Sequence, residues 1–506
     1  MPRGGVKFWN SPRYFWIFPI EPEPGRPKDE TWAYGKGLGG SSALNGTMYL
    51  RGEPGDYDSW QAQGNEGWNW NEIERCFKEL EDFQAPGAHP SRGKGGPVQI
   101  TVVPEKTLIS EAVIAAGEQM GLPRLEDVNA PSAVGVGYTQ TTVDGSRRRV
   151  SGYTAFLKPA MVRKNFTVMT GVRVNRILFE GTRARSVSYS SRGSEITVNA
   201  CKEVIVCAGV LQSPKLLQLS GIGPRELLYV HNIPLVHDLP AVGQNMTEHP
   251  MFSLSFRLKG GPVGMNREFR GWRLLKNVLQ YFVLRSGVMS YTAPEITALL
   301  STSGEAAAPD VHAAIAPFSF ERTPGKLVEP GRARTEDKPG ITVTSFFLRP
   351  RSRGSVSIRS ADVNDAPRIQ ANWLTDERDC RDVVAMIKLI RRLMNQPALK
   401  NYVGEETAPG THIETDEQLL EAARGSLSSG LHGTGTCRMG NDANSVVDAR
   451  LRVHGVSGLR VVDCSVMPTC ISGNTNGPAM AVALRASELI LQDRDRDVAL
   501  KTATTI

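Results

Sequence analysis

The stretch Gly35-Lys-Gly-Leu-Gly-Gly-Ser-Ser-Ala-Leu-Asn-Gly-Thr-Met-Tyr49 decides how the rest of the chain is interpreted. Its first six residues satisfy G-x-G-x-x-G, but a dinucleotide fingerprint also needs a buried strand before it and a helix after it. The residues from Asp29 to Tyr34 read as a poor buried strand. This stretch is therefore not interpreted as the opening of a Rossmann unit. Its glycines instead indicate a loop whose backbone lies close to a bound ligand.

Length and composition predict a protein with more than one core. The chain has 506 residues, of which 40% are hydrophobic and 22% charged, and single cores stop growing at roughly 250–300 residues. Its apolar runs fall short of the roughly 20 residues that a membrane-spanning helix requires. The N-terminal sequence also lacks an apolar signal core. We therefore expect no membrane span and a cytoplasmic location.

Cysteine usage and charge exclude several classes of site. The seven cysteines are irregularly spaced, which argues against a disulfide framework and against zinc, so no metal is expected. The formal charge of +7 is a mild excess for this length, and nucleic-acid binding is not expected. The densest basic cluster, Arg147–Arg149, lies in a loop-like stretch beside Asp144 and Gly145.

The pattern of apolar residues predicts two kinds of sheet. Short β-branched runs that end in Gly or Asp are typical of a parallel, cofactor-binding sheet, and they occur at 203–207, 459–462 and 166–169 with 172–179. Partial alternation favours antiparallel strands at 251–258, 309–316, 340–348 and 354–359. The predicted fold class is α/β (α+β mixed). A three-layer nucleotide-binding domain with a parallel sheet is interrupted by a domain with an antiparallel sheet and flanking helices.

An amphipathic helix is predicted after these strands. Its apolar face consists of Val383, Met386, Ile387, Ile390 and Leu393. Its opposite face carries a basic stripe of Lys388, Arg391 and Arg392. We interpret this stripe as a solvated surface.

The stretch from Gly35 to Tyr49 resembles, almost position for position, the first signature of the glucose–methanol–choline (GMC) oxidoreductases. Further family segments follow in order. They are Ala208–Pro224, which resembles the second signature, Val242–His249, which resembles VGxNLxDH with Glu248 where Asp is usual, and Arg349–Gly354, which resembles RPxSRG. The resemblance covers nearly the whole chain.

This resemblance implies a FAD enzyme that oxidises an alcohol to an aldehyde or ketone. The positions that match the family's cofactor contacts are Gly37, Gly39, Gly40, Ser41, Asn45, Gly46, Thr47, Met48, Val174, Ala208, Gly209, Asp463, Cys464, Gly477 and Pro478. Some relatives tether FAD through a histidine of the first signature. Leu44 stands at that position here, so FAD is expected to be held non-covalently. The implied FAD-binding domain comprises residues 1–57, 160–250 and 431–506, and the substrate-binding domain comprises 58–159 and 251–430.

The resemblance also implies two catalytic residues. His432 matches the active-site histidine of the family, and Asn476 matches its second active-site position. A neutral imidazole can accept the hydroxyl proton while a hydride leaves for flavin N5. An amide such as that of Asn476 can hold the substrate oxygen. A helix that begins near Pro478 would aim its positive end at the flavin.

Several alternatives stay open at this point. The other histidines, His249 included, are interpreted as structural, and Cys437 and Cys464 as packed thiols. A non-redox relative similar to hydroxynitrile lyases would keep the same base. The family normally opens with a strand, a G-x-G-x-x-G loop and a helix, and the sequence begins past that unit. We expect a truncated form of a longer enzyme, with an inactive remnant as the alternative. The alcohol and the electron acceptor (oxygen, a quinone or another) are not predicted.

Overall fold

The computed structural model describes residues 1–8, 11–26, 30–259, 263–303, 308–321 and 334–504. Its largest element is an eight-stranded sheet. The strands run in the order β21 (Val403–Ala408), β15 (Pro250–Leu258), β18 (Gly340–Phe347), β17 (Val311–Ala316), β16 (Ile296–Leu300), β7 (Gly135–Tyr138) and β6 (Arg124–Leu125), with β22 (Ser428–Ser429) also paired to β15. All pairs are antiparallel except β6–β7. The antiparallel sheet predicted for the middle of the chain is confirmed, although residues 355–357 form β19 (Ser355–Ser357) in a separate pair with β20 (Arg368–Gln370).

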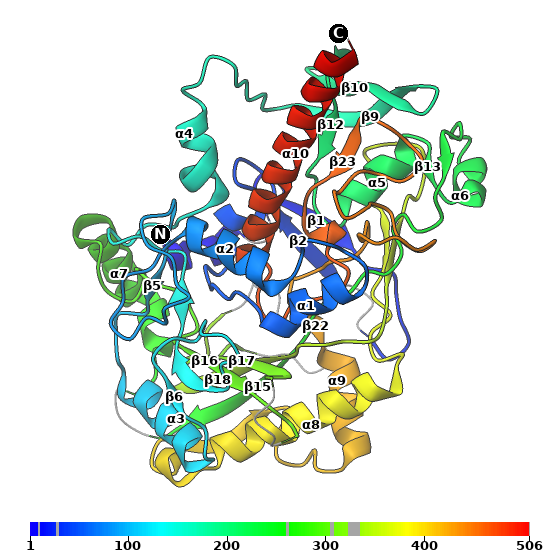
Figure 1. The fold of residues 1–506 in the computed structure, drawn as a ribbon. Coiled ribbons are helices and arrows are strands. Elements are labelled where there is room, and N and C mark those ends of the chain that lie inside the picture. The colour runs from blue at the N-terminus through cyan, green and yellow to red at the C-terminus, as the bar shows by residue number, and fades with distance from the viewer. Residues whose placement is uncertain (9–10, 27–29, 260–262, 304–307, 322–333, 505–506) are drawn as a thin grey trace.

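Three helices pack below this sheet in Figure 1: α3 (Leu108–Gln119), α8 (Glu377–Met394) and α9 (Asp416–Ser426). The apolar face predicted for α8 is confirmed, because all five of its residues are buried. Of the basic stripe, Lys388 and Arg392 are exposed. Arg391 differs, because its guanidinium donates to the carboxylate of Glu406 on β21 at 2.7 and 2.8 Å. The stripe is therefore solvated in part and joins α8 to the sheet edge in part.

The other half of the molecule is built around the long helix α10 (Asn476–Thr504), drawn in red in Figure 1. The same half contains α1 (Pro54–Ala62), α2 (Trp70–Leu80), α5 (Gln212–Leu219), α6 (Arg225–Val230) and the parallel pair of β12 (Val204–Val206) and β23 (Leu459–Val461). The parallel pairing predicted for 203–207 and 459–462 is thus confirmed. Among the described residues, no helix is both long and apolar enough to cross a bilayer.

The third predicted parallel strand is wrong. Residues 166–169 form no strand, and Phe166 and Met169 are exposed. β9 (Arg173–Glu180) pairs antiparallel with β10 (Arg183–Ser191), which in turn pairs with β11 (Ser194–Asn199). Only residues 181 and 182 separate β9 from β10, and so short a connection can join only antiparallel neighbours.

The segment before the first glycine-rich stretch also differs from expectation. It forms β2 (Thr31–Gly35), in which Trp32 and Ala33 are buried, while Asp29 lies outside the described residues. However, β2 pairs antiparallel with β1 (Phe15–Pro19) and is followed by a short 3₁₀ helix, η2 (Gly40–Ala43). The conclusion that this stretch is not a Rossmann opening therefore holds, although its strand was missed.

Two large hydrophobic cores match the expectation from length. One surrounds the eight-stranded sheet, α3 and α8, and the other surrounds α2, α10, β12 and β23. Trp60 of α1 and residues of α2, which the sequence-based division assigned to the substrate-binding part, contribute to the second core. The domain boundaries given above stay a prediction.

A buried ion network fixes the chain just after the glycine-rich stretch. Arg51 donates from Nε to Glu81 at 2.6 Å, and Arg92 donates to the same carboxylate at 2.9 Å and to Asp127 at 2.7 Å. All four side chains are buried. Burial raises the pKa of Glu81, but Arg92 and Arg51 outweigh it and hold that pKa below its ordinary value. The segment after Tyr49 is thereby tied to the end of α2.

Candidate active site

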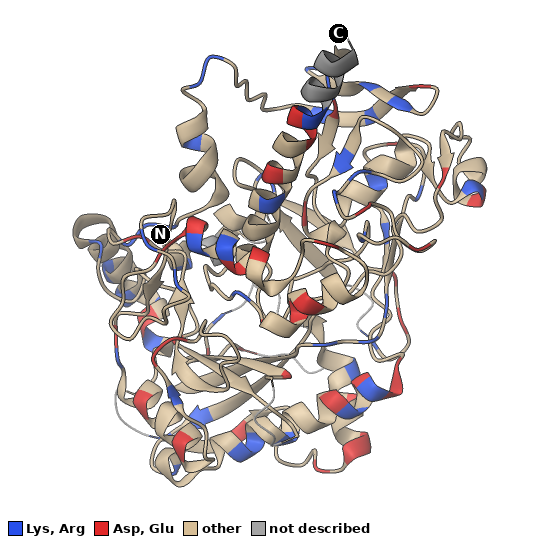
Figure 2. Ribbon diagram, in the orientation of Figure 1, with Lys and Arg blue, Asp and Glu red and all other residues tan. Residues whose placement is uncertain are grey.

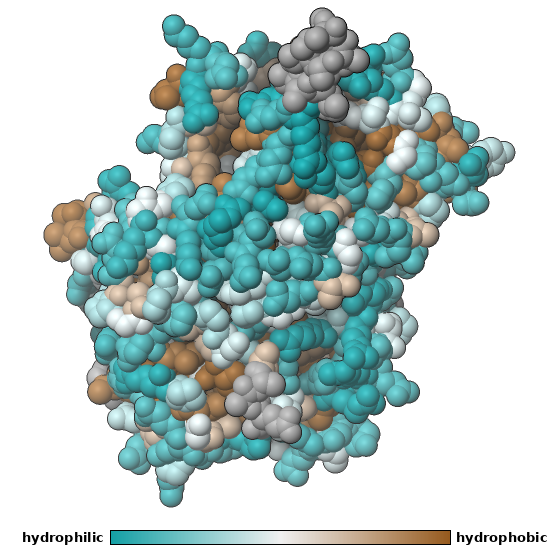
Figure 3. Space-filling view, viewed as in Figure 1, coloured by the Kyte–Doolittle hydropathy of each residue, from teal (hydrophilic) through white to brown (hydrophobic). Residues whose placement is uncertain are grey.

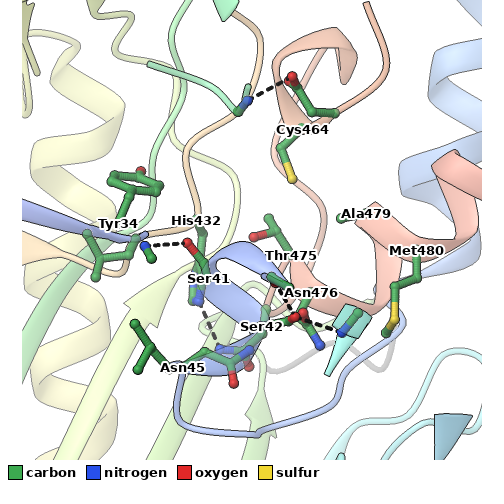
Figure 4. A pocket seen from close by; sticks show the side chains of 18 of the residues that line it. Tyr34, Ser41, Ser42, Asn45, His432, Cys464, Thr475, Asn476, Ala479 and Met480 are labelled. Carbon is green, nitrogen blue, oxygen red and sulfur yellow. Dashed lines mark hydrogen bonds between the residues drawn. The ribbon is translucent and has the colours of Figure 1, made fainter. Parts of the chain in front are cut away.

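A cavity of about 650 Å³ lies where the two halves of the molecule meet. Five separate parts of the chain supply most of its wall: residues 33–48, 209–210, 430–433, 463–464 and 474–487. Figure 4 shows Ser41, Ser42 and Asn45 of the glycine-rich stretch together with residues from the start of α10. A cavity of this size is typical of small-molecule sites.

The glycine-rich stretch forms the tightly turned wall of this cavity. Gly39 has φ +89° and Gly40 φ +55°, values that favour glycine. A Cβ on Gly35 would lie 2.5 Å from the carbonyl oxygen of Gly40, so the turn closes only around glycine. Asn45 Oδ1 accepts from the backbone N–H of Thr47 at 3.0 Å and from Arg149 at 2.6 Å. The loop is therefore held in shape by its own side chains and by one partly buried arginine.

The second predicted signature is held by Asp463. Its Oδ2 accepts from the backbone N–H of Gly209 at 2.9 Å and from the hydroxyl of Ser213 at 2.6 Å, and its Oδ1 accepts from Ser465 N at 2.8 Å. Gly209 has φ +86°, and a Cβ there would meet no atom within 4 Å. Asp463 thus joins the ends of β12 and β23 and leaves the Gly209 backbone facing the cavity.

His432 sits at the centre of a chain of hydrogen bonds. His249 Nε2 lies 3.1 Å from the carbonyl oxygen of Leu348, and His249 Nδ1 lies 3.2 Å from His432 Nδ1. A carbonyl oxygen only accepts, so His249 Nε2 carries a proton and its Nδ1 is the acceptor. It follows that His432 Nδ1 donates to His249 and that His432 Nε2 carries a lone pair.

The surroundings keep this imidazole neutral. Burial, followed by the neighbouring His249 and His312, lowers the pKa of His432 well below its ordinary value. His312 is itself buried against the ring of Phe346, at 5.4 Å between centroids, and burial lowers its pKa to about 3. His432 is therefore an unprotonated base at neutral pH.

Asn474 is the amide that contacts this base. Its Nδ2 lies 2.8 Å from His432 Nε2, and its Oδ1 is buried without a partner among the described residues. Asn476, the predicted second catalytic residue, also lines the cavity but lies at the first position of α10. The structure thus places Asn474 rather than Asn476 against His432, and the catalytic role given to Asn476 stays a prediction.

Glu248 completes the surroundings of His432. Its Oε1 accepts from the backbone N–H of His432 at 2.9 Å, while its Oε2 is buried and unpartnered among the described residues. Burial raises the pKa of Glu248 to about 8, so it is largely protonated at neutral pH. The hydroxyl of Tyr34 is also buried and unpartnered among the described residues. A Cβ added to Gly433 would lie 3.2 Å from this hydroxyl and 3.4 Å from Glu248 Oε2, so the two groups face the same side of Gly433.

Most of the predicted cofactor positions meet at the cavity. Those that line it, with the two predicted catalytic residues, are Gly39, Ser41, Asn45, Gly46, Thr47, Met48, Gly209, His432, Asp463, Cys464 and Asn476. Those outside its lining are Gly37, Gly40, Val174, Ala208, Gly477 and Pro478. Val174 lies on the partly exposed strand β9, and Gly477 packs against Leu50 O, 2.8 Å from where its Cβ would be. Burial raises the pKa of the Cys437 and Cys464 thiols, which fits packed thiols.

Sequence reasoning missed three functional contacts. Asn474 stands in Gly-Asn-Thr-Asn-Gly, where two asparagines compete and only the turn geometry shows which one reaches His432. His249 was interpreted as structural, although its place in a family motif was a usable signal. Arg149 belongs to a basic cluster that suggested a surface loop, yet its guanidinium reaches Asn45 and burial lowers its pKa to about 10.

Comparison with known proteins identifies the family of this chain. Models of the N- and C-terminal parts of the GMC oxidoreductases match residues 28–251 and 350–483. An oxygen-dependent choline dehydrogenase of Escherichia coli is 36% identical over 94% of this chain and 85% of its own length. A crystal structure of pyridoxine 4-oxidase from Mesorbium loti has a TM-score of 0.83 at 28% identity, covering 96% of this chain and 90% of that one.

A second solved structure, a FAD-dependent oxidoreductase from Chaetomium thermophilum, has a TM-score of 0.85 at 26% identity and covers 95% of this chain and 91% of that one. The two family matches cover most of the residues that line the cavity. The chain therefore belongs to the GMC oxidoreductase family and is an enzyme of the alcohol oxidase or dehydrogenase type.

Proposed function

We propose that this enzyme binds FAD in the 650 Å³ cavity and that His432 Nε2 accepts the hydroxyl proton of the alcohol that is oxidised. One observation carries the proposal. The hydrogen bonds from His432 to His249 and from His249 to Leu348 leave the lone pair of His432 on Nε2, which lies beside Asn474 at the cavity wall. A base held neutral and in one tautomer suits proton abstraction near neutral pH.

The cavity wall fits a flavin in its chemistry. Backbone groups of Gly39, Gly46 and Gly209 are open to it, and a Cβ on Gly46 or Gly209 would meet no protein atom within 4 Å, so the ligand can approach the backbone closely. α10 begins at the cavity with Asn476, and the positive end of a helix dipole favours negative charge there. When bound, FAD supplies the acceptor for the hydride of the alcohol carbon. Non-covalent binding, inferred from Leu44, is part of the proposal.

We assign the substrate-holding amide to Asn474 rather than to Asn476. Its Nδ2 donates toward the base and its unpartnered Oδ1 is buried at the cavity. An alcohol oxygen that replaces the direct hydrogen bond between Nδ2 and His432 Nε2 would accept from the amide while it gives its proton to the imidazole. Asn476 lies at the helix start and would contact the cofactor instead.

The substrate is proposed to be a small alcohol, with choline and pyridoxine as first candidates because the relatives carry those names. Among the described residues that line the cavity, Asp463 is the only carboxylate, and its oxygens already accept from Gly209, Ser213 and Ser465. The lining therefore offers no free negative charge to a trimethylammonium group, and neutral alcohols belong in the same screen.

The test starts from the visible spectrum of the purified chain after FAD addition and desalting. Retained flavin bands that bleach anaerobically with one of the alcohols would support the proposal. His432→Ala is expected to keep the flavin but to slow bleaching by roughly 10²–10⁴-fold. Asn474→Ala is expected to slow bleaching more than Asn476→Ala does. Substrate turnover without bleaching would point to a lyase and contradict the redox role.

A further inference from the structure

Helix α7 (Gly271–Leu284) has an exposed apolar face. Five of its large side chains are between 55% and 76% exposed: Trp272, Leu275, Leu279, Phe282 and Val283. At 100° per residue these positions fall within one stripe along the helix. Figure 3 shows hydrophobic residues at the left edge of the molecule, where Figure 1 places α7. Contiguous apolar surface of this kind marks an interaction site.

The opposite face of α7 attaches the helix to the protein through polar groups. Asn277 is buried and donates to the backbone oxygen of Glu268 at 2.9 Å. Tyr281 is also buried, and its hydroxyl donates to the backbone oxygen of Arg147 at 3.0 Å. An ordinary surface helix buries its apolar stripe and exposes its polar one, so the orientation of α7 is reversed.

Basic residues surround this face. From residue 266 to residue 285 the sequence holds five positive side chains and one acidic one: Arg267, Arg270, Arg273, Lys276 and Arg285 against Glu268. Two of the five are paired, Arg273 with Glu268 at 2.7 Å and Arg270 with Asp337 at 2.5 Å, so the surroundings of the face are basic but partly compensated. Figure 2 shows blue segments along α7. The Arg147–Arg149 cluster joins them, because Tyr281 contacts Arg147 and the Arg285 guanidinium lies 4.9 Å from the Tyr281 ring.

We propose that the exposed face of α7 docks this protein on a membrane surface that carries anionic lipid headgroups. Trp, Phe and Leu on one face with Lys and Arg beside them are what interfacial helices use to lie in the headgroup plane. The 14 residues of α7 span about 21 Å, so the helix lies on the bilayer and does not cross it. This inference is independent of the proposed reaction, because none of these α7 residues lines the cavity.

Charge favours a membrane over a second copy of this chain. In a twofold dimer the same patch faces itself, which would bring two basic clusters together around the apolar stripe. Anionic headgroups neutralise that charge and each nearby Lys or Arg strengthens the attraction. The exposed face of α7 therefore complements an anionic lipid surface better than it complements the same face of a second copy.

The test is sedimentation of the full chain with phosphatidylcholine vesicles, with and without phosphatidylglycerol. We expect binding that depends on phosphatidylglycerol and is weakened by salt. Leu275→Ser/Phe282→Ser removes two exposed apolar side chains and is expected to lower the partition coefficient on the order of a hundredfold. Tyr229→Ser/Val230→Ser on α6 is the matched control, since those side chains are 82% and 70% exposed, and it is expected to bind like the wild type.

The outcomes distinguish a lipid surface from a second copy of this chain as the partner of the α7 face. Far-UV circular dichroism and the melting temperature establish that both variants are folded. Equal pelleting of wild type and Leu275→Ser/Phe282→Ser would overturn the proposal, as would failure of the wild type to pellet with phosphatidylglycerol. Sedimentation velocity without lipid adds a second criterion. A dimer that dissociates in the Leu275→Ser/Phe282→Ser variant, without vesicle binding, would assign the face to a second copy instead.

Discussion

The two ring nitrogens of His249 make different hydrogen bonds: Nε2 donates to Leu348 O, and Nδ1 accepts from His432 Nδ1. We predict that His249→Leu, which leaves His432 Nδ1 without an acceptor, lowers kcat/KM for the alcohol by roughly 10–100-fold, as is usual when the group that orients a functional histidine is removed.

A matched variant separates orientation from packing. His249→Asn keeps an acceptor close to where Nδ1 lies and is expected to retain most of the activity, with the same flavin content by absorbance. Equal losses in the Leu and Asn variants would contradict the orienting role and leave His249 a packing residue.

The pH dependence of His432 is the second prediction at this scale. Its pKa is lowered by burial and by His249 and His312, so the neutral imidazole predominates at pH 6.5 and above. We expect kcat/KM of the flavin-loaded enzyme to be independent of this base above pH 6.5, with the acid limb below that value. A limb attributable to His432 at pH 6.5 or higher, absent in His432→Ala, would contradict it.

Among the elements, α2 illustrates how charge anchors the cavity wall. Glu81 follows α2 and shares its carboxylate between Arg51 and Arg92, all of them buried. Removing that charge by Glu81→Gln leaves the buried guanidinium of Arg51 without its carboxylate and that of Arg92 with Asp127 alone, and we expect a loss of about 3–5 kcal/mol in the free energy of unfolding.

The control for this prediction is an exposed ion pair of similar geometry. Arg185 donates to Glu180 at 2.8 Å on the hairpin of β9 and β10, where both side chains are exposed. Glu180→Gln is expected to cost less than about 1 kcal/mol in the same urea titration. Similar losses in both variants would show that the buried network contributes no more than a surface pair.

At the scale of the whole molecule, buried titratable groups set the pH of greatest stability. His249, His312 and His432 have lowered pKa values and stay neutral in the fold, so the unfolded chain binds more protons below pH 6.5 and stability falls as pH drops. Glu53 and Glu248 have pKa values raised to about 8, so the fold binds more protons between pH 4.5 and 8 and stability falls as pH rises.

These opposing effects predict a maximum near pH 6.5 in the free energy of unfolding, measured by urea titration at a series of pH values. Glu248→Gln keeps an acceptor for the His432 N–H and removes one of the two acidic groups. The variant is therefore expected to lose less stability than the wild type between pH 6.5 and 8. An identical slope in both proteins would show that Glu248 does not titrate in this range.

The sequence predicted those parts of the molecule whose structure is set locally. The turns of Gly35–Tyr49 depend on glycines a few residues apart, and the face of α8 repeats with the helical period, so both were predicted. β9 was assigned to the wrong kind of sheet because its partner is chosen by a two-residue turn rather than by its own composition. Asn474 contacts His432 across more than 40 positions of the sequence, and Arg149 contacts Asn45 across more than 100. No local pattern specifies such contacts.

One end of α10 lines the cavity and the helix then leads away from it toward the C-terminus. Leu491, half exposed, lies 15 residues beyond Asn476, and so about 22 Å away along a rigid rod. A fluorescent donor attached there, once the exposed Cys201 and Cys207 are replaced, would be quenched by energy transfer whenever a flavin occupies the cavity. Because the helix fixes this separation, the fluorescence of the donor would report the binding and release of the flavin in real time.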